Sequence, residues 1–372
     1  MVFRVLSIDG GGMRGLYTST YLAALEEGFS NRFGAKSGLD IGSAFNLIVG
    51  TSTGAIIGCG IAQGVPPKKM AELYRNNGKK IFPIVIPSKV DLRSFWSLIR
   101  RMLPLPIRWN HLSQGENGLR DALKDVFGDV TLRQLYSERK IALAIPAVDM
   151  ATYRPWVFKT PHLSSSNGRD NNYKIVDVCL ASSAAPIYRS LAALKKPDGN
   201  EFDIFSDGGL WANNPILVAL IEALRIIEDR NDEESEIEIF CLGTFAKPEG
   251  RLIKPKKRCW GLRKWKFGGE AASLSLSSQS VAFTQMARQI SPFLRSKVRI
   301  INFPQGQSSS EMLEYLGLDE TRATGMDALM RQARRDADTA NSYSQDSSNV
   351  EGQSIRELFE SMATRLETIV GD

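Results

Sequence analysis

Histidine is scarce in this sequence, and its scarcity restricts the chemistry. The 372 residues include two histidines, His111 and His162, and both precede the acidic motif that begins at Asp207. A hydrolase with the serine–acid–histidine order of the α/β-hydrolases needs a histidine after its acid. That order is therefore excluded. Both histidines lie in polar, loop-like sequence, so we expect each to be a surface residue and not a catalytic base.

Cysteine and long apolar runs are scarce as well. The four cysteines, Cys59, Cys179, Cys241 and Cys259, lie far apart, so we expect neither a disulfide framework nor a metal-binding C-x-x-C pair. No apolar run approaches the roughly 18 residues of a membrane-spanning helix. Asp9 interrupts the first apolar run too early for a signal peptide. We therefore expect a soluble, cytoplasmic protein with no metal and no tightly bound cofactor.

The overall composition is that of a globular protein with a sizeable core. Apolar residues make up 43% of the chain and charged residues 24%. The net charge of +6 is unevenly spread, since 229–238 is acidic and 251–266 is basic. An excess of this size is compatible with an anionic partner but does not demand one.

The sharpest motif is Gly50-Thr51-Ser52-Thr53-Gly54. An apolar run at 45–49 predicts a buried strand before it, and the small apolar residues of 55–62 predict a helix after it. A G-x-S-x-G between a strand and a helix predicts a nucleophile elbow, in which the serine adopts strained backbone angles. Gly50 and Gly54 would then remove the Cβ atoms that otherwise clash.

A glycine loop lies nearer the N-terminus, between a predicted strand at 3–8 and a predicted helix at 16–27. Its sequence is Asp9-Gly10-Gly11-Gly12-Met13-Arg14-Gly15. The glycine spacing also matches the dinucleotide-binding fingerprint, but the Asp9 charge would oppose a pyrophosphate, and the next strand ends in the serine motif instead of a ribose-binding acid. The alternative is an oxyanion hole built from backbone N–H groups. Arg14 is available to hold the loop or to meet an anionic headgroup.

The third motif is Asp207-Gly208-Gly209, after a predicted strand at 202–206. It places a carboxylate on a tight turn, at the sheet edge where Ser52 is expected. Because no histidine is suitably placed, we predict a Ser52–Asp207 dyad, with the glycine loop and the N–H of Thr53 as the oxyanion site. A carboxylate is a weaker base than imidazole, so Asp207 needs partial desolvation to raise its pKa.

Strands alternate with helices along the chain, which predicts an α/β fold with a mainly parallel sheet. Further predicted strands cover 141–148, 237–243 and 297–303, and further predicted helices cover 66–80, 118–127, 175–184, 214–228, 271–288, 321–340 and 354–369. In the helix at 214–228, Asn214 is expected as the N-cap and Pro215 as the first residue. Residues 341–352 form the only obvious linker. The basic, proline-rich stretch 81–108 is interpreted as a lid, a membrane-facing surface or a partly buried excursion.

The three motifs, in this order and spacing, resemble those of the patatin-like phospholipases over roughly residues 3–220. The resemblance implies a three-layer α/β/α fold and calcium-independent lipid acyl hydrolysis by a Ser–Asp dyad. It implies a catalytic core at 3–220 and a C-terminal segment at 221–372, partly helical, that packs on or regulates the core. The residues matched to the oxyanion site are Gly10, Gly11, Gly12, Arg14, Gly15 and Thr53, and the glycines of the elbow and acid turn are Gly50, Gly54, Gly208 and Gly209.

Within that family the chain is similar to bacterial effectors of antiphage systems that a cyclic dinucleotide switches on and that degrade the cell's own membrane. This similarity implies a phospholipid substrate at the inner face of the cell membrane, a cyclic dinucleotide activator and a homo-oligomer. It implies no DNA or RNA partner. The alternatives are a constitutive lipase without nucleotide control and a nucleotide sensor without catalysis.

Cations and aromatic residues alternate in the basic stretch 251–266. Its candidate contact residues are Lys256, Lys257, Arg258, Trp260, Arg263 and Trp265. Such residues suit the phosphates and bases of a cyclic dinucleotide. They equally suit an anionic membrane surface, and a solvated basic loop is the third interpretation. The sequence leaves all three open.

Overall fold

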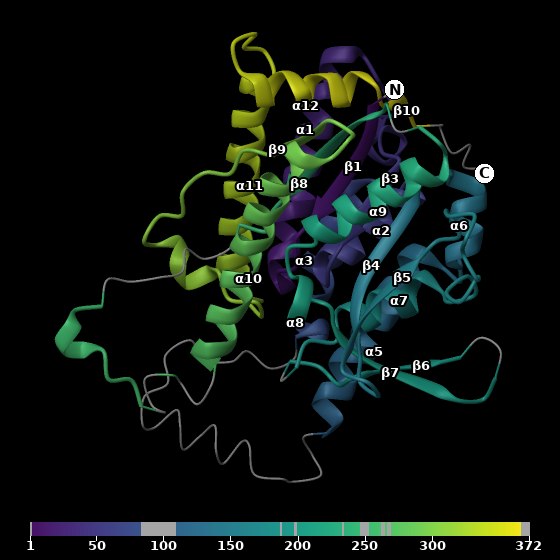
Figure 1. Cartoon of the computed structure of the whole chain (residues 1–372). Coiled ribbons are helices and arrows are strands. Elements are labelled where there is room, and N and C mark those ends of the chain that lie inside the picture. The colour runs from purple at the N-terminus through teal and green to yellow at the C-terminus, as the bar shows by residue number, and fades with distance from the viewer. Residues whose placement is uncertain are drawn as a thin grey trace, which may run out of the picture.

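The computed structural model describes residues 2–82, 109–186, 188–196, 199–232, 234–245, 253–261, 265 and 269–365 (Figure 1). Its strands are β1 (Val2–Ile8), β2 (Leu39–Asp40), β3 (Leu47–Gly50), β4 (Ala142–Asp149), β5 (Arg154–Lys159), β6 (Ala192–Lys195), β7 (Phe202–Asp207), β8 (Glu236–Leu242), β9 (Val298–Asn302) and β10 (Ala363–Thr364). Its α-helices are α1 (Gly15–Phe33), α2 (Thr53–Gln63), α3 (Pro67–Ile81), α5 (Trp109–Phe127), α6 (Leu132–Arg139), α7 (Ile175–Ser182), α8 (Gly209–Ala212), α9 (Ile216–Asp229), α10 (Gly269–Ile290), α11 (Ala323–Tyr343) and α12 (Val350–Glu360).

Within the described ranges an eight-stranded sheet forms the centre of the molecule. Its order is β6-β7-β4-β3-β1-β8-β9, and β5 pairs with β4 outside this path. The five strands from β4 to β9 are parallel, whereas β5, β6 and β7 pair antiparallel with their neighbours. The predicted mainly parallel α/β sheet is confirmed.

Alternate residues of the central strands face two different helical layers. Leu6 and Ile8 of β1 belong to the core cluster shared with α1, α2, α3, α7 and α11. Phe3 and Val5 of the same strand belong to the cluster shared with α9. Side chains of a strand alternate between the two faces of its sheet, so both faces are covered. Figure 1 shows the resulting three-layer α/β/α architecture, with α9 in front of the sheet and α1 behind it.

The C-terminal segment is integrated into this architecture. β8 pairs with β1 and β9 pairs with β8, so both extend the central sheet. Helix α11 packs along α1, and the Phe359 ring of α12 stacks on Phe29 of α1 at a centroid distance of 4.2 Å. The division of the chain at residue 220 stays a prediction.

Several predicted boundaries are wrong. The expected linker at 341–352 contains the end of α11 and the start of α12. Helix α12 starts within it because the side chain of Asn349 caps the helix, accepting a hydrogen bond from the N–H of Gly352 at 2.8 Å. Helix α12 also ends at Glu360, well before the expected 369. Helix α9 starts at Ile216 with Pro215 at its N-cap, one residue later than expected.

Several described elements are absent from the sequence-based assignment: β2, β5, β6, β10, α6 and α8. Helix α6 carries a recognisable start signal, since Thr131 and Gln134 form a reciprocal capping box. The predicted lid or membrane-facing stretch lies almost wholly outside the described residues, which resume at Trp109. In the part of the chain that the structure describes, none of the helices combines the length and apolar character needed to cross a bilayer.

Candidate active site

Ser52 lies at the sharp turn between β3 and α2. Its backbone angles, φ 55° and ψ −118°, fall outside the regions that L-residues prefer. A Cβ on Gly50 would overlap the carbonyl of Gly54, and one on Gly54 would overlap the carbonyl of Ile8. The strained turn and the need for both flanking glycines are as the motif predicted. The strain presents the Ser52 side chain at the carboxyl end of the parallel strands.

The Ser52 hydroxyl and the Asp207 carboxylate are in direct contact. Ser52 Oγ donates to Asp207 Oδ2 at 2.8 Å, and the N–H of Gly209 donates to the other carboxylate oxygen at 2.6 Å. Both Ser52 and Asp207 are buried. Burial raises the pKa of Asp207 to about 6, although the N–H of Gly209, the Ser52 hydroxyl and the charge of Arg189 act in the opposite direction. A carboxylate of this kind can take a proton from the serine near neutral pH.

Strand pairing explains how two distant motifs meet. β3 and β5 both pair with β4 at Ala144, so they occupy opposite edges of β4. β5 and β7 both pair with β4 at Ala147, so β7 lies on the edge that β3 occupies. β3 and β7 therefore approach each other end to end along one edge of β4. Asp207 was expected at this sheet edge, but it reaches it on an antiparallel strand.

A short segment at the end of α7 holds both halves of the site. The N–H of Ser52 donates to Ser182 Oγ at 2.9 Å, and that hydroxyl donates to the carbonyl of Pro146 at 2.6 Å. The N–H groups of Asp207 and Gly208 donate to the carbonyls of Ala184 (3.0 Å) and Ser182 (3.1 Å). Sequence reasoning assigned close packing to 175–184 and missed this role.

The glycine loop lies against the elbow, and its backbone donors are not equivalent. The hydroxyl of Thr53 donates to the carbonyl of Gly12 at 2.6 Å and so joins the loop to α2. The N–H of Gly10 is already used, because it donates to the carbonyl of Asn213 at 2.9 Å. The N–H of Gly15 is used in the same way, since it closes the 3₁₀ turn at 12–14. Both glycines are thereby removed as oxyanion donors, which corrects the expectation for them.

Three N–H groups remain at the junction of the loop and the elbow. Within the described ranges, no hydrogen bond is made by the N–H of Gly11, Gly12 or Thr53. Gly12 has φ +58°, and a Cβ there would overlap the carbonyl of Leu318. A side chain is thus excluded where the backbone must turn. These three donors are the ones available to an oxygen beside Ser52.

Arg14 holds the loop from inside. Its side chain is buried, and its Nε donates to the carbonyl of Gly11 at 3.3 Å. Burial raises the pKa of the neighbouring Asp9 to about 7, against the opposing charge of Arg14. Of the two roles considered for Arg14, the geometry favours the support of the loop over contact with a headgroup.

The histidine expectations need correction. His162 is buried, with Nδ1 2.8 Å from Thr160 Oγ1 and Nε2 2.9 Å from a carboxylate oxygen of Glu222. It is not a surface residue, and these two contacts occupy both of its ring nitrogens. His111 lies in the first turn of α5, not in a loop, and its side chain lies outside the described part of the chain.

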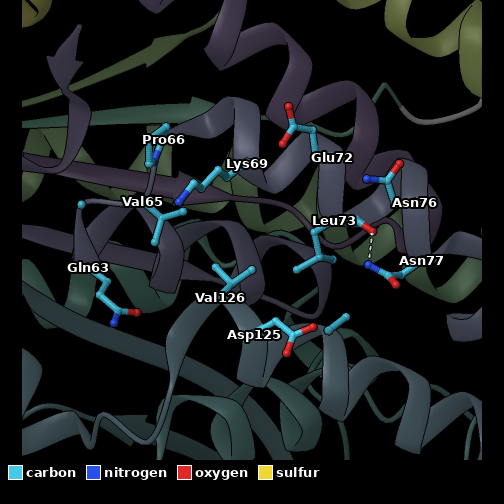
Figure 2. Close-up of a pocket in the computed structure, with 12 residues that line it drawn as sticks. Gln63, Val65, Pro66, Lys69, Glu72, Leu73, Asn76, Asn77, Asp125 and Val126 are labelled. Atoms are coloured by element: carbon cyan, nitrogen blue, oxygen red, sulfur yellow. Dashed lines mark hydrogen bonds between the residues drawn. The ribbon is translucent and has the colours of Figure 1, made fainter. Parts of the chain in front are cut away.

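Two cavities lie away from the Ser52–Asp207 pair. One, of about 490 Å³, lies between the end of α2, α3 and α5 and is lined by polar side chains that include Lys69, Asn76 and Asp125 (Figure 2). A larger groove of about 820 Å³ runs over α1 between α3 and α11, where Arg75 and Arg334 line it. Neither cavity is lined by a residue of the three motifs.

The basic stretch is described only in part. Lys256 and Arg258 are exposed, and Trp260 and Trp265 are half-buried with ring centroids 5.0 Å apart. Arg263 and the side chain of Lys257 lie outside the described residues. All three interpretations of this stretch stay open.

Comparison with known proteins identifies the family. The model of the family described as patatin-like phospholipase matches residues 6–220. A Pseudomonas aeruginosa protein named "cGAMP-activated phospholipase" is 33% identical over 290 residues, 77% of this chain and 75% of that protein. Proteins of the same name from Escherichia coli and Vibrio cholerae are 33% and 32% identical, and the matches cover 70% and 65% of this chain and 69% and 64% of theirs.

The matched region contains the elbow, the glycine loop and the acid turn, so the resemblance drawn from those motifs is confirmed. The mostly parallel sheet between helical layers is the fold that the resemblance implied. On these grounds the chain belongs to the patatin-like phospholipase family and is a lipid acyl hydrolase.

Proposed function

We propose that Ser52 is the nucleophile and Asp207 the general base of phospholipid hydrolysis. The observation that carries this proposal is the 2.8 Å hydrogen bond from Ser52 Oγ to Asp207 Oδ2. As Ser52 Oγ attacks the ester carbonyl carbon, its proton passes to Asp207. The N–H groups of Gly11, Gly12 and Thr53 donate to the oxyanion, and each such donor is typically worth about 3 kcal/mol of transition-state stabilisation.

The second half of the cycle returns the enzyme to its starting state. The tetrahedral intermediate collapses, the C–O bond to the lysophospholipid breaks, and the leaving oxygen takes the proton from Asp207. Water then attacks the acyl-Ser52 ester while Asp207 accepts a water proton. Cleavage of that ester gives the proton back to Ser52 Oγ and releases a fatty acid. No step requires a calcium ion, so we expect full activity in the presence of a calcium chelator.

The pH dependence tests the proposed base. Asp207 accepts a proton only when it is ionised, so kcat/KM is expected to rise with pH through about 6 and to level off above it. Initial rates of fatty-acid release from phosphatidylcholine vesicles measure this, because the phosphodiester and quaternary ammonium of that headgroup do not titrate across the pH range of the experiment. A rise centred near the ordinary aspartate value of 3.8 would contradict the buried-base assignment.

We further infer that a cyclic dinucleotide activates this hydrolase at the inner face of the cell membrane. The support is that three curated relatives are each named "cGAMP-activated phospholipase". Fatty-acid release from anionic vesicles is expected to be low without nucleotide and to rise at least about 10-fold with one member of a cyclic dinucleotide panel. High activity without any nucleotide would leave the lipase intact and remove this inference.

The basic stretch is the proposed binding region, because exposed cations lie beside a pair of tryptophan rings there. The variant Lys256→Ala/Arg258→Ala/Trp260→Ala is expected to raise the nucleotide concentration needed for half-maximal activation about 10-fold or more. Lys174→Ala, which removes an exposed cation elsewhere, is the matched control. A response to Arg75→Ala or Arg334→Ala instead would move the site to the groove over α1.

A further inference from the structure

Arg189 is a buried cation without an ion pair. Its side chain is 8% exposed, and in the part of the chain that the structure describes it lies within salt-bridge distance of no carboxylate. One nitrogen donates to the carbonyl and hydroxyl of Ser183, at 3.4 and 3.1 Å, and Nε has no hydrogen-bond partner. The guanidinium also lies over the ring of Phe82, 4.9 Å from its centroid. Burying a charge without a partner is costly, so a purely structural role explains this arginine poorly.

Hydrogen bonds anchor Arg189 and the proposed base to the same short segment of backbone. Three consecutive residues at the end of α7, Ser182, Ser183 and Ala184, each hold one part of the site. The carbonyl of Ser182 accepts a hydrogen bond from the N–H of Gly208, and that of Ala184 accepts one from the N–H of Asp207. Between them, the carbonyl of Ser183 accepts a hydrogen bond from the guanidinium of Arg189. Arg189 and Asp207 are therefore anchored to adjacent residues of one segment, which fixes the cation relative to the carboxylate.

Few charged groups other than Arg189 could keep the carboxyl group of Asp207 ionised. The titratable groups whose charges act on Arg189 are Tyr74 on α3, Asp207 at the end of β7 and Glu116 on α5. Glu116 has its own cation, because Arg120 lies 3.2 Å from it. Burial lowers the pKa of Arg189 to about 10, so its charge persists at neutral pH. Among the described residues, Arg189 is the only charged group that acts on the pKa of Asp207.

We propose that Arg189 is a positioning residue whose buried positive charge keeps the Asp207 carboxyl ionised beside Ser52. This inference rests on the proposed function, in which Asp207 is the general base. The lack of a direct salt bridge between Arg189 and Asp207 matters for catalysis. A bidentate arginine–carboxylate pair would lower the pKa of the carboxyl so far that the carboxylate becomes a weak base. Held at the distance that this segment sets, the charge of Arg189 offsets part of the desolvation cost of the ionised Asp207 carboxylate. The carboxylate can then still accept the proton of Ser52.

The test is the pH profile of kcat/KM for fatty-acid release, measured on the full chain under the condition of highest wild-type activity. Arg189→Met removes the charge, and the acid limb is expected to move up by about one pH unit, which is about a fivefold loss at pH 6 and approaches a loss of about 10-fold at lower pH. Arg189→Lys is expected to keep the midpoint near that of wild type. Arg32→Met is the matched control, since Arg32 also lies over a phenylalanine ring, at 4.7 Å, but on the outer end of α1.

The outcomes distinguish a failure of the role inferred for Arg189 from a failure of Asp207 as the general base. A folded Arg189→Met enzyme whose rate falls equally at every pH, with an unmoved midpoint, would show that the arginine only packs and would overturn the inference. Arg189→Gln keeps hydrogen-bond donors for Ser183 and decides the matter by the same midpoint if the methionine variant does not fold. Substantial activity of Asp207→Asn would instead remove the proposed base, whatever Arg189 does.

Discussion

Replacing Ser52 with alanine is expected to lower kcat/KM for phospholipid hydrolysis by at least about 10⁴-fold, the usual scale when a covalent nucleophile is lost. The substitution deletes one oxygen and leaves the surrounding supports in place, since Gly209 still donates to Asp207 and Ser182 still accepts the N–H of residue 52. Vesicle binding and thermal stability should therefore change little. The same variant is expected to lose all labelling by a fluorophosphonate probe, which reacts only with an activated serine.

Ser137→Ala is the matched control, because Ser137 is an exposed serine on α6 whose hydroxyl bonds only to the local backbone. It should hydrolyse lipid and accept the probe like the wild type. Retained hydrolysis in Ser52→Ala, with labelling of another serine, would remove the elbow from the mechanism and reopen the search for the nucleophile.

Replacing Asp207 with asparagine is expected to lower kcat by about 10³-fold or more and to leave KM nearly unchanged. Asparagine has almost the same shape and can still accept the N–H of Gly209, but it cannot take the Ser52 proton. Fluorophosphonate labelling should slow by a similar factor, which shows the loss of activation without any lipid present. The comparison of single-turnover and steady-state release identifies the chemical step as the one affected.

Asp203→Asn provides the control on the same strand. Asp203 is only part-buried and contacts Lys196 and Tyr173 away from Ser52, so its loss should change kcat less than about twofold. An active Asp207→Asn enzyme together with an inactive His111→Ala enzyme would contradict the dyad and restore a histidine to the mechanism.

The elbow was predictable because everything it requires lies within one short stretch. A buried strand, a turn with two glycines and a helix follow one another from β3 to α2, and local sequence specifies each of them. The glycine loop after β1 is local in the same sense. Local sequence does not determine which N–H groups of this loop are already hydrogen-bonded. The partners of Gly10 and Met13 are the carbonyls of Asn213 and Leu318, which lie far along the chain.

The features of the site that sequence reasoning missed depend on pairing between distant parts of the chain. His162 looks like a loop residue until Glu222 of α9, sixty positions away, is brought to its ring. The antiparallel approach of β7 depends on how far β4 extends beyond β3, which no property of 202–207 reveals. The role inferred for Arg189 was missed for the same reason, since it depends on the burial of the side chain, which the local sequence does not reveal.

The pairing of β1 bears on when the activity can arise as the protein is synthesised. β1 precedes the other described strands in the sequence, yet it lies between β3 and β8, and its seven residue pairs with β8 need residues 236–242. The glycine loop gains the carbonyl of Leu318 later still. A nascent chain that has emerged only as far as α9 holds Ser52 and Asp207 but lacks β8 as a neighbour of β1 and the carbonyl of Leu318 as an anchor of the glycine loop. The order of residues along the chain thus delays complete assembly of the site for lipid acyl hydrolysis until β8 and Leu318 have been synthesised.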